Sequence, residues 1–122
     1  MDNNDFSEVI KAFHLMWDAF PGMARLIDKR HKVIASNPIA QSKGFMPDVL
    51  CAKVASPDIH KKCKMAITLK TGMAYADRVI EDRIRGWQPV PGYPGLVVHF
   101  AIMIPDTEGN RNQSLSPWQK TF

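Results

Sequence analysis

The clearest hydrophobic pattern in the chain lies between Asp5 and Phe20, where apolar residues recur at three- and four-residue steps. This spacing places them on one face of an α-helix. The residues on that face are Phe6, Val9, Ile10, Phe13, Met16, Trp17 and Phe20. Pro21 and Gly22 end the helix, because proline cannot continue a helical turn and glycine permits a reversal. We predict that this segment, residues 1–22, covers the outer face of a sheet or contacts a second copy of the chain.

A short β-hairpin is predicted after this helix. The apolar segments Met23–Ile27 and Lys32–Ala35 flank a polar stretch, as two strands joined by a turn do. Asn37 and Pro38 then predict the start of a short helix. Asparagine accepts hydrogen bonds from the free N–H groups of a first turn, and proline suits the first helical position.

A longer helix is predicted to begin at Ser56-Pro57-Asp58 and to end at Gly72. Serine can cap the helix, proline suits its first turn, and aspartate is favourable beside the positive end of the helix dipole. Its inward face is predicted to carry Ile59, Cys63, Ala66, Ile67 and Leu69, with His60 at the boundary. Its opposite face is predicted to carry Lys61, Lys64 and Thr68.

Two strands are predicted in the second half of the chain, at Met73–Ile80 and Leu96–Ile104. The second is almost wholly apolar, which is typical of a central strand covered on both faces. Its predicted faces are Val97, His99, Ala101 and Met103 on one side, and Leu96, Val98, Phe100, Ile102 and Ile104 on the other. Between the strands, residues 85–95 hold three prolines and three glycines, which predicts part of a strand followed by a long loop.

Composition fits a single globular domain of 122 residues, with 45% hydrophobic and 23% charged residues. The apolar run Leu96–Ile104 is far shorter than the roughly 20 residues of a membrane span, so no membrane association is expected. The chain starts with polar and acidic residues, unlike a secretory signal, and we predict a cytoplasmic protein. Cys51 and Cys63 are therefore predicted to be reduced thiols.

The formal net charge of +4 raises the possibility of nucleic-acid binding. The basic clusters at 29–32 and 61–64 lack the interleaved aromatic residues of a base-stacking surface, and no nucleic-acid-binding motif is present. We therefore expect solvated basic surfaces, with a nucleic-acid adaptor as an alternative. Motifs for a serine nucleophile, a zinc protease or a phosphate loop are also absent, so we predict no enzyme. A small isomerase-like enzyme remains an alternative.

The stretch "LIDKRHKVIASNPIAQSKGF" resembles a PAS sensor domain, in which a hairpin runs into an asparagine, an alanine and a Gly-aromatic pair. Those positions are Asn37, Ala40 and Gly44-Phe45 here. The segment "SPDIHKKCKMAITLKTG" resembles the longer PAS helix, which ends at a pair such as Thr71-Gly72. The resemblance covers residues 20–106 and implies a PAS-like sensor domain over 23–106, followed by a polar tail at 107–122.

The PAS resemblance implies an α+β fold with a five-stranded antiparallel sheet, helices on one face and a cavity between the sheet and the helices. It also implies a sensor that binds a small molecule or cofactor of unknown identity without covalent attachment. The signal would pass to a homodimer partner or another signalling protein. The residues that we predict to contact the ligand are Ile59, His60, Cys63, Ile67, Tyr75, Trp87, Val97, His99, Ala101 and Met103.

A haem or metal site is a further alternative for this sensor. Cys51, His60, Cys63 and His99 could supply two sulfur and two nitrogen ligands, but their spacing matches no zinc ribbon or finger. His60 lies on the helix that carries the proximal histidine of haem-binding PAS proteins, although one position from the usual place. Trp87 and Tyr93 border the proline-rich stretch, where their rings could form a cover over the pocket.

Overall fold

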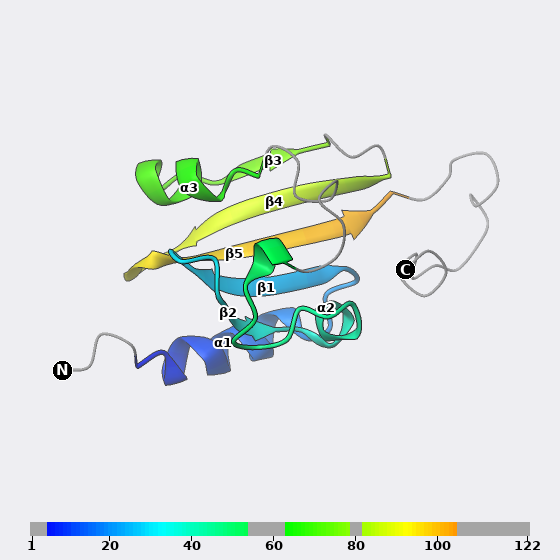
Figure 1. Ribbon diagram of the computed structural model, residues 1–122, viewed down its shortest axis with the longest axis horizontal. Coiled ribbons are helices and arrows are strands. Elements are labelled where there is room, and N and C mark those ends of the chain that lie inside the picture. The colour runs from blue at the N-terminus through cyan, green and yellow to red at the C-terminus, as the bar shows by residue number, and fades with distance from the viewer. Residues whose placement is uncertain (1–4, 54–62, 79–81, 105–122) are drawn as a thin grey trace.

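The computed structural model describes residues 5–53, 63–78 and 82–104, and these residues form one five-stranded antiparallel sheet flanked by helices (Figure 1). The strand order is β2-β1-β5-β4-β3. The strands are β1 (Met23–Asp28), β2 (Val33–Ser36), β3 (Tyr75–Asp77), β4 (Arg83–Val90) and β5 (Tyr93–Met103). The α+β fold class predicted from the sequence is confirmed. The predicted tail, residues 107–122, and the positions 79 and 80 of the predicted strand at 73–80 lie outside the described residues.

β5 is the central strand, as its apolar sequence predicted, and it pairs with β1 on one side and β4 on the other. Its alternate residues enter two separate cores. Val97, Ala101 and Met103 join the cluster on the face that we call the inner face. Leu96 and Val98 join the cluster on the outer face. Both faces of the strand are therefore covered.

The outer face is covered by α1 (Ser7–Trp17), which contacts β1 and β2 and lies behind the sheet in Figure 1. Phe13 is buried in the outer core, and Phe6, Val9, Ile10, Trp17 and Phe20 pack around it. This confirms the predicted covering role. The prediction was wrong for Met16, which is 74% exposed. Met16 lies at the edge of the predicted stripe, and one edge of a helix that packs on a flat sheet remains in solvent.

Asn37 joins three elements at the buried start of α2 (Pro38–Ser42). Its side-chain oxygen accepts hydrogen bonds from the backbone N–H groups of Ala40 (3.0 Å) and Ala24 (3.1 Å). Its Nδ2 donates to the carbonyl oxygens of Trp17 (3.1 Å) and Gly22 (2.9 Å). The predicted cap is confirmed, and the same side chain also ties the end of α1 to β1.

The helix that ends at Gly72 begins at Met65, and the predicted start at Ser56-Pro57-Asp58 lies outside the described residues. α3 spans Met65–Thr71 and ends at Gly72, whose φ of 68° places it in the left-handed region. Cys63 and Lys64 precede the helix, and residues 54–62 lie outside the described residues. Met65 and Thr68 are buried, and the Thr68 hydroxyl donates to the Lys64 carbonyl oxygen (2.8 Å).

The observed packing of α3 overturns part of the predicted inward face of the helix. Cys63, Ala66 and Ile67 are exposed, whereas Thr68, predicted to face solvent, is buried. The inward face of this two-turn helix is formed by Met65, Thr68 and Leu69 at i, i+3 and i+4 spacing. Thr68 tolerates burial because its hydroxyl is satisfied within the helix.

The predicted long loop at residues 85–95 is a tight β-hairpin instead. β4 and β5 are joined at Pro91 and Gly92, and Gly92 has a φ of 83°. The register shifts between Pro89 and Val90. A bulge of this kind accepts a proline that cannot donate to the ladder, which is why prolines did not end the strand. The predicted cover of residues 87–93 was therefore wrong, and Trp87 is fully buried in β4.

The inner face is covered by α2, α3 and the short 3-10 helix η1 (Cys51–Lys53) (Figure 1). The predicted β1–β2 hairpin is confirmed, with His31 adopting the positive φ (65°) that a glycine commonly supplies. No helix within the described ranges is both long and apolar enough to cross a membrane.

Candidate functional site on the inner face

A row of large polar and aromatic side chains crosses four strands on the inner face. Arg25 of β1 pairs with His99 of β5, His99 pairs with Trp87 of β4, and Trp87 pairs with Tyr75 of β3. Because strand side chains alternate between faces, residues paired in this way point to the same side of the sheet. Arg25, His99 and Trp87 are buried, and Tyr75 is half-buried at the sheet edge.

A second row lies beside the first and consists of Met23, Ala101, Arg85 and Asp77. Arg85 donates from Nε to Oδ1 of Asp77 and from Nη2 to Oδ2, both at 3.0 Å. Lys64, just before α3, donates to the same Oδ2 at 2.8 Å. These two cations share one carboxylate under the helix, and this arrangement fixes the start of α3 on the edge of the sheet.

Trp87 is enclosed by charged and aromatic groups. The His99 ring stacks on it, with centroids 4.5 Å apart and an interplanar angle of 10°. The guanidinium carbon of Arg85 lies 4.9 Å from the centroid of the Trp87 ring. Despite these contacts, the buried indole Nε1 has no hydrogen-bond partner within the described part of the chain.

His99 is held by the backbone of the neighbouring strand. Its Nδ1 lies 2.8 Å from the carbonyl oxygen of Gly86. A carbonyl only accepts, so Nδ1 carries the proton in this contact. The sequence left open whether His99 is a hydrogen-bonded core residue or a ligand contact. The bond to Gly86 shows that the side chain is hydrogen-bonded in the core, and ligand contact stays a prediction.

Arg25 is the most unusual group on the inner face. Its side chain is only 3% exposed, and its guanidinium lies 4.3 Å from the centroid of the Phe45 ring. Nη1 donates to the Cys51 sulfur at 3.6 Å, whereas Nε has no partner among the described residues. Burial lowers the pKa of the Arg25 guanidinium from its usual value, partly opposed by the neighbouring Cys51. A buried cation thus lacks a carboxylate partner in the described ranges.

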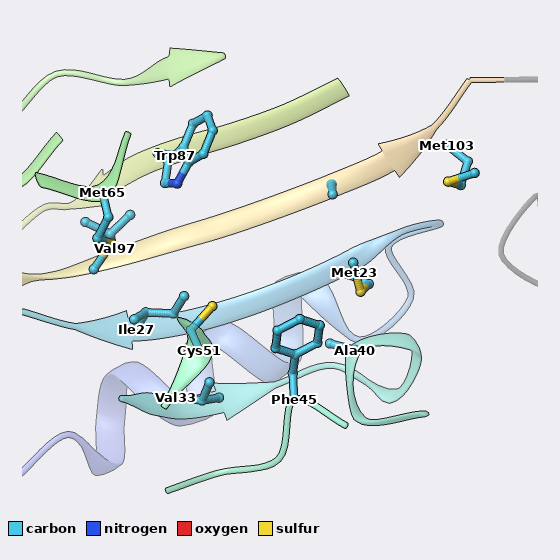
Figure 2. Close-up of a cluster of buried hydrophobic side chains, with 11 residues drawn as sticks. Met23, Ile27, Val33, Ala40, Phe45, Cys51, Met65, Trp87, Val97 and Met103 are labelled. Atoms are coloured by element: carbon cyan, nitrogen blue, oxygen red, sulfur yellow. The ribbon is translucent and has the colours of Figure 1, made fainter. Parts of the chain in front are cut away.

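Cys51 does not supply the missing negative charge. Burial raises the pKa of the Cys51 thiol, more than the nearby Arg25 lowers it. The thiol is therefore neutral at physiological pH and is a weak acceptor. Figure 2 shows Phe45 and Cys51 beside β1 and Trp87 on β4. Because β5 lies between β1 and β4, the surroundings of Arg25 and the Trp87 ring are on opposite sides of β5.

The structure brings together five of the ten predicted contact residues on the inner face. Trp87, Val97, His99, Ala101 and Met103 share the inner face, and Tyr75 lies at its edge. Cys63 and Ile67 are exposed, so the prediction that they face inward was wrong, and their contact with a ligand stays a prediction. Ile59 and His60 lie outside the described residues.

Sequence reasoning missed the charged residues of the site, chiefly Arg25, Arg85 and Asp77. A signal for Arg25 was present, because it alternates with Met23 and Ile27 in an apolar strand and so shares their face. For the metal alternative, no group of three His, Cys, Asp or Glu side chains is suitably placed among the described residues.

Comparison with known proteins establishes the fold. No family model and no curated protein matches the sequence. Among solved structures, the chain is similar to a sensory box sensor histidine kinase from Vibrio cholerae, with a TM-score of 0.58 and 11% sequence identity. The similarity covers 86% of this chain and 97% of that chain. The fold is PAS-like. At this identity the similarity extends to the fold alone, in agreement with the resemblance seen around Asn37.

Proposed function

We propose that this PAS-like domain is a sensor that binds a small molecule non-covalently on the inner face of the sheet. The observation that carries the proposal is a pair of buried donors, Arg25 Nε and Trp87 Nε1, which have no acceptor in the described part of the chain. A buried donor without an acceptor costs about 1 to 3 kcal/mol, and native cores retain few of them. A bound molecule that supplies acceptors to both donors accounts for their retention.

The surroundings of these donors suit a small molecule. Arg25 and Trp87 flank His99 on neighbouring strands, so their backbones are about 10 Å apart. The next row places the small Ala101 between Met23 and Arg85. Binding sites typically combine apolar walls with a few convergent polar groups, and this face has both. We propose a ligand with a largely apolar or aromatic body.

We propose that occupancy of this site is reported through α1. Ala24 follows Met23 on β1, directly before Arg25, and its N–H donates to Asn37. The same Asn37 donates to the carbonyl oxygen of Trp17 at the end of α1. A shift of β1 around a ligand would therefore change the position of α1.

The far side of α1 supports a homodimer as the receiver of this signal. Leu15 is 87% exposed and Met16 is 74% exposed, one turn from the exposed Ala12. Apolar residues at i, i+3 and i+4 form a short exposed stripe that suits a second copy of the same helix. A separate signalling protein that binds the same stripe is the other possible receiver.

The test uses freshly purified protein, its mass and absorbance spectra, and an Ala101→Phe variant. We expect a copurified small molecule in the parent and its loss from the variant. If the site is hollow, Ala101→Phe melts close to the parent. If the site is packed, the added ring costs about 1 to 3 kcal/mol. Ala76→Phe, at an exposed position of β3, is the matched control. A parent without any small molecule, together with a destabilised Ala101→Phe, would indicate a ligand-free interaction module.

A further inference from the structure

We propose that the molecule sensed on the inner face carries a carboxylate, and that the Nε and Nη2 edge of Arg25 binds it. This inference rests on the proposed function, because it assigns a chemical class to the ligand of the same site. Arg85 provides the geometric precedent within the same sheet. Its Nε and Nη2 bind the two carboxylate oxygens of Asp77 side by side.

Arg25 presents the same edge without an acceptor. Its one hydrogen bond within the described residues uses Nη1, which donates to the Cys51 sulfur. Nε is buried and unpartnered. A planar guanidinium fork matches a carboxylate in geometry as well as charge, and such paired bonds are among the strongest hydrogen bonds in proteins.

The charge balance of the inner face favours an anion. The basic side chains on or beside it are Arg25, Lys64, Arg83 and Arg85. Within the described part of the chain, the ion pairs of these groups include Asp77 and Asp82. Asp82 contacts Arg83, and Asp77 serves both Arg85 and Lys64. Among the described residues, Arg25 therefore has no anion of its own, and one negative charge would neutralise it.

Arg25 is also held ready for such a ligand. The guanidinium carbon of Arg25 lies over the Phe45 ring, and the Cys51 sulfur accepts a hydrogen bond from Nη1. A side chain fixed before binding loses little rotamer entropy when the ligand arrives. A single guanidinium fork suits a carboxylate monoanion better than a phosphate dianion, which requires more donors. Trp87 Nε1 would supply a second contact to an acceptor elsewhere on the ligand.

The experiment measures binding of three acids, each compared with its uncharged amide. The probes are benzoate, phenylacetate and succinate, then benzamide, phenylacetamide and succinamide, with inorganic phosphate as a separate oxyanion. Binding is followed by calorimetry and by the NMR resonance of the Arg25 Nε–H. The variants are Arg25→Met, which keeps an apolar stem, and Arg25→Lys, which keeps the charge without the fork. Arg30→Met, in the exposed β1–β2 turn, is the matched control.

We expect at least one acid to bind the parent at least tenfold more tightly than its amide and to shift the Arg25 resonance. Arg25→Met and Arg25→Lys should each lose at least tenfold in affinity for that acid, whereas Arg30→Met should bind as the parent does. Arg25→Met should also melt at or above the parent temperature without ligand, because an unpaired buried cation has been removed.

The opposing outcomes separate this inference from the proposed function. If the amides bind as tightly as the acids and Arg25→Met retains both, the site binds small molecules but the carboxylate assignment is wrong. If inorganic phosphate alone binds, the anion class is wrong. If neither the acids, the amides nor phosphate binds the parent, the proposed function fails together with this inference.

Discussion

Arg85 and Asp77 face each other across β4 and β3, joined by two hydrogen bonds of 3.0 Å, and Lys64 adds a third of 2.8 Å to the same carboxylate. The Arg85 side chain is 2% exposed and that of Asp77 is 11% exposed. In this environment the contribution of the cluster to stability depends on all three side chains, because any charge left without its partner is poorly solvated.

We predict that Asp77→Asn strongly destabilises the protein. The substitution removes the negative charge between Arg85 and Lys64, and breaking a buried pair in this way costs about 3 to 5 kcal/mol. Urea unfolding measures the loss. Asp48→Asn is the control, since the Asp48 side chain is 88% exposed and lies 3.8 Å from Lys32. The control should change the free energy of unfolding by less than about 1 kcal/mol. Equal effects of the two variants would show that the buried cluster contributes no more than a surface pair.

A second prediction concerns Gly86 in β4, which lies against the ring of Phe100 on the outer face. A Cβ atom added at Gly86 would overlap that ring. Phe100 in turn stacks on Trp17 of α1, with ring centroids 5.6 Å apart. We expect Gly86→Ala to cost about 1 to 3 kcal/mol through overpacking. We also expect it to speed hydrogen exchange in α1, because the ring that supports the helix must move.

Gly95 provides the matched control for this prediction. It lies in β5, the nearest atom to an added Cβ is 4.0 Å away on the Lys29 side chain, and its φ is not positive. Gly95→Ala should therefore leave the exchange of α1 unchanged. An α1 that exchanges at the parent rate in Gly86→Ala would contradict the proposed support by Phe100.

The third prediction separates the two sides of α1. Phe13→Asp or Trp17→Asp places a charge in the outer core and should lower the melting temperature by many degrees. Met16→Asp changes a residue that is 74% exposed and should leave melting unchanged while it weakens a homodimer. Sedimentation and thermal melting report the two effects. Unchanged melting in Phe13→Asp would show that α1 is not docked on the sheet.

Much of the fold could be predicted because the relevant signals are local. The alternating faces of Leu96–Ile104 and the cap at Asn37 each depend on neighbouring residues. The β4–β5 hairpin was missed because prolines normally interrupt a ladder, and only the register with β5 shows that Pro89 lies at a bulge. The inward face of α3 was misjudged because an assumed start at residue 58 changed which residues were expected to pack.

The candidate site was predictable only in part. The position of Trp87, His99 and Ala101 on one face follows from strand alternation once β4 and β5 are paired. The burial of Arg25 without an acceptor for its Nε does not follow from its neighbours in sequence. It depends on two segments that pack over β1: η1, which carries Cys51, and the turn after α2, which carries Phe45. These are contacts between distant segments, which no local pattern encodes.

The fourth prediction concerns the reactivity of the two cysteines, both of which are unbridged. Cys63 is exposed, whereas Cys51 is buried and burial raises the pKa of its thiol. Because the thiolate is the reactive form, iodoacetamide at pH 8 should modify Cys63 much faster than Cys51 in the folded protein. Both should react in urea, as peptide mass spectrometry will show. Fast modification of Cys51 in the folded protein would contradict its burial, and failure of both to react in urea without reductant would indicate a disulfide.

The last prediction is a loss of stability at alkaline pH that depends on Cys51. Burial raises the pKa of Cys51 in the folded state, so folding favours the protonated thiol. Between the unfolded and folded pKa values the folded protein binds more protons, and the free energy of unfolding must fall as pH rises. The contribution is fully present below about pH 8.5, the usual thiol value, and is lost as pH rises through the raised pKa. Urea unfolding from pH 7 to pH 10 should therefore show a steeper decline in the parent than in Cys51→Ala. Cys63→Ser, at the exposed thiol, should follow the parent, and identical slopes in the parent and Cys51→Ala would contradict the prediction.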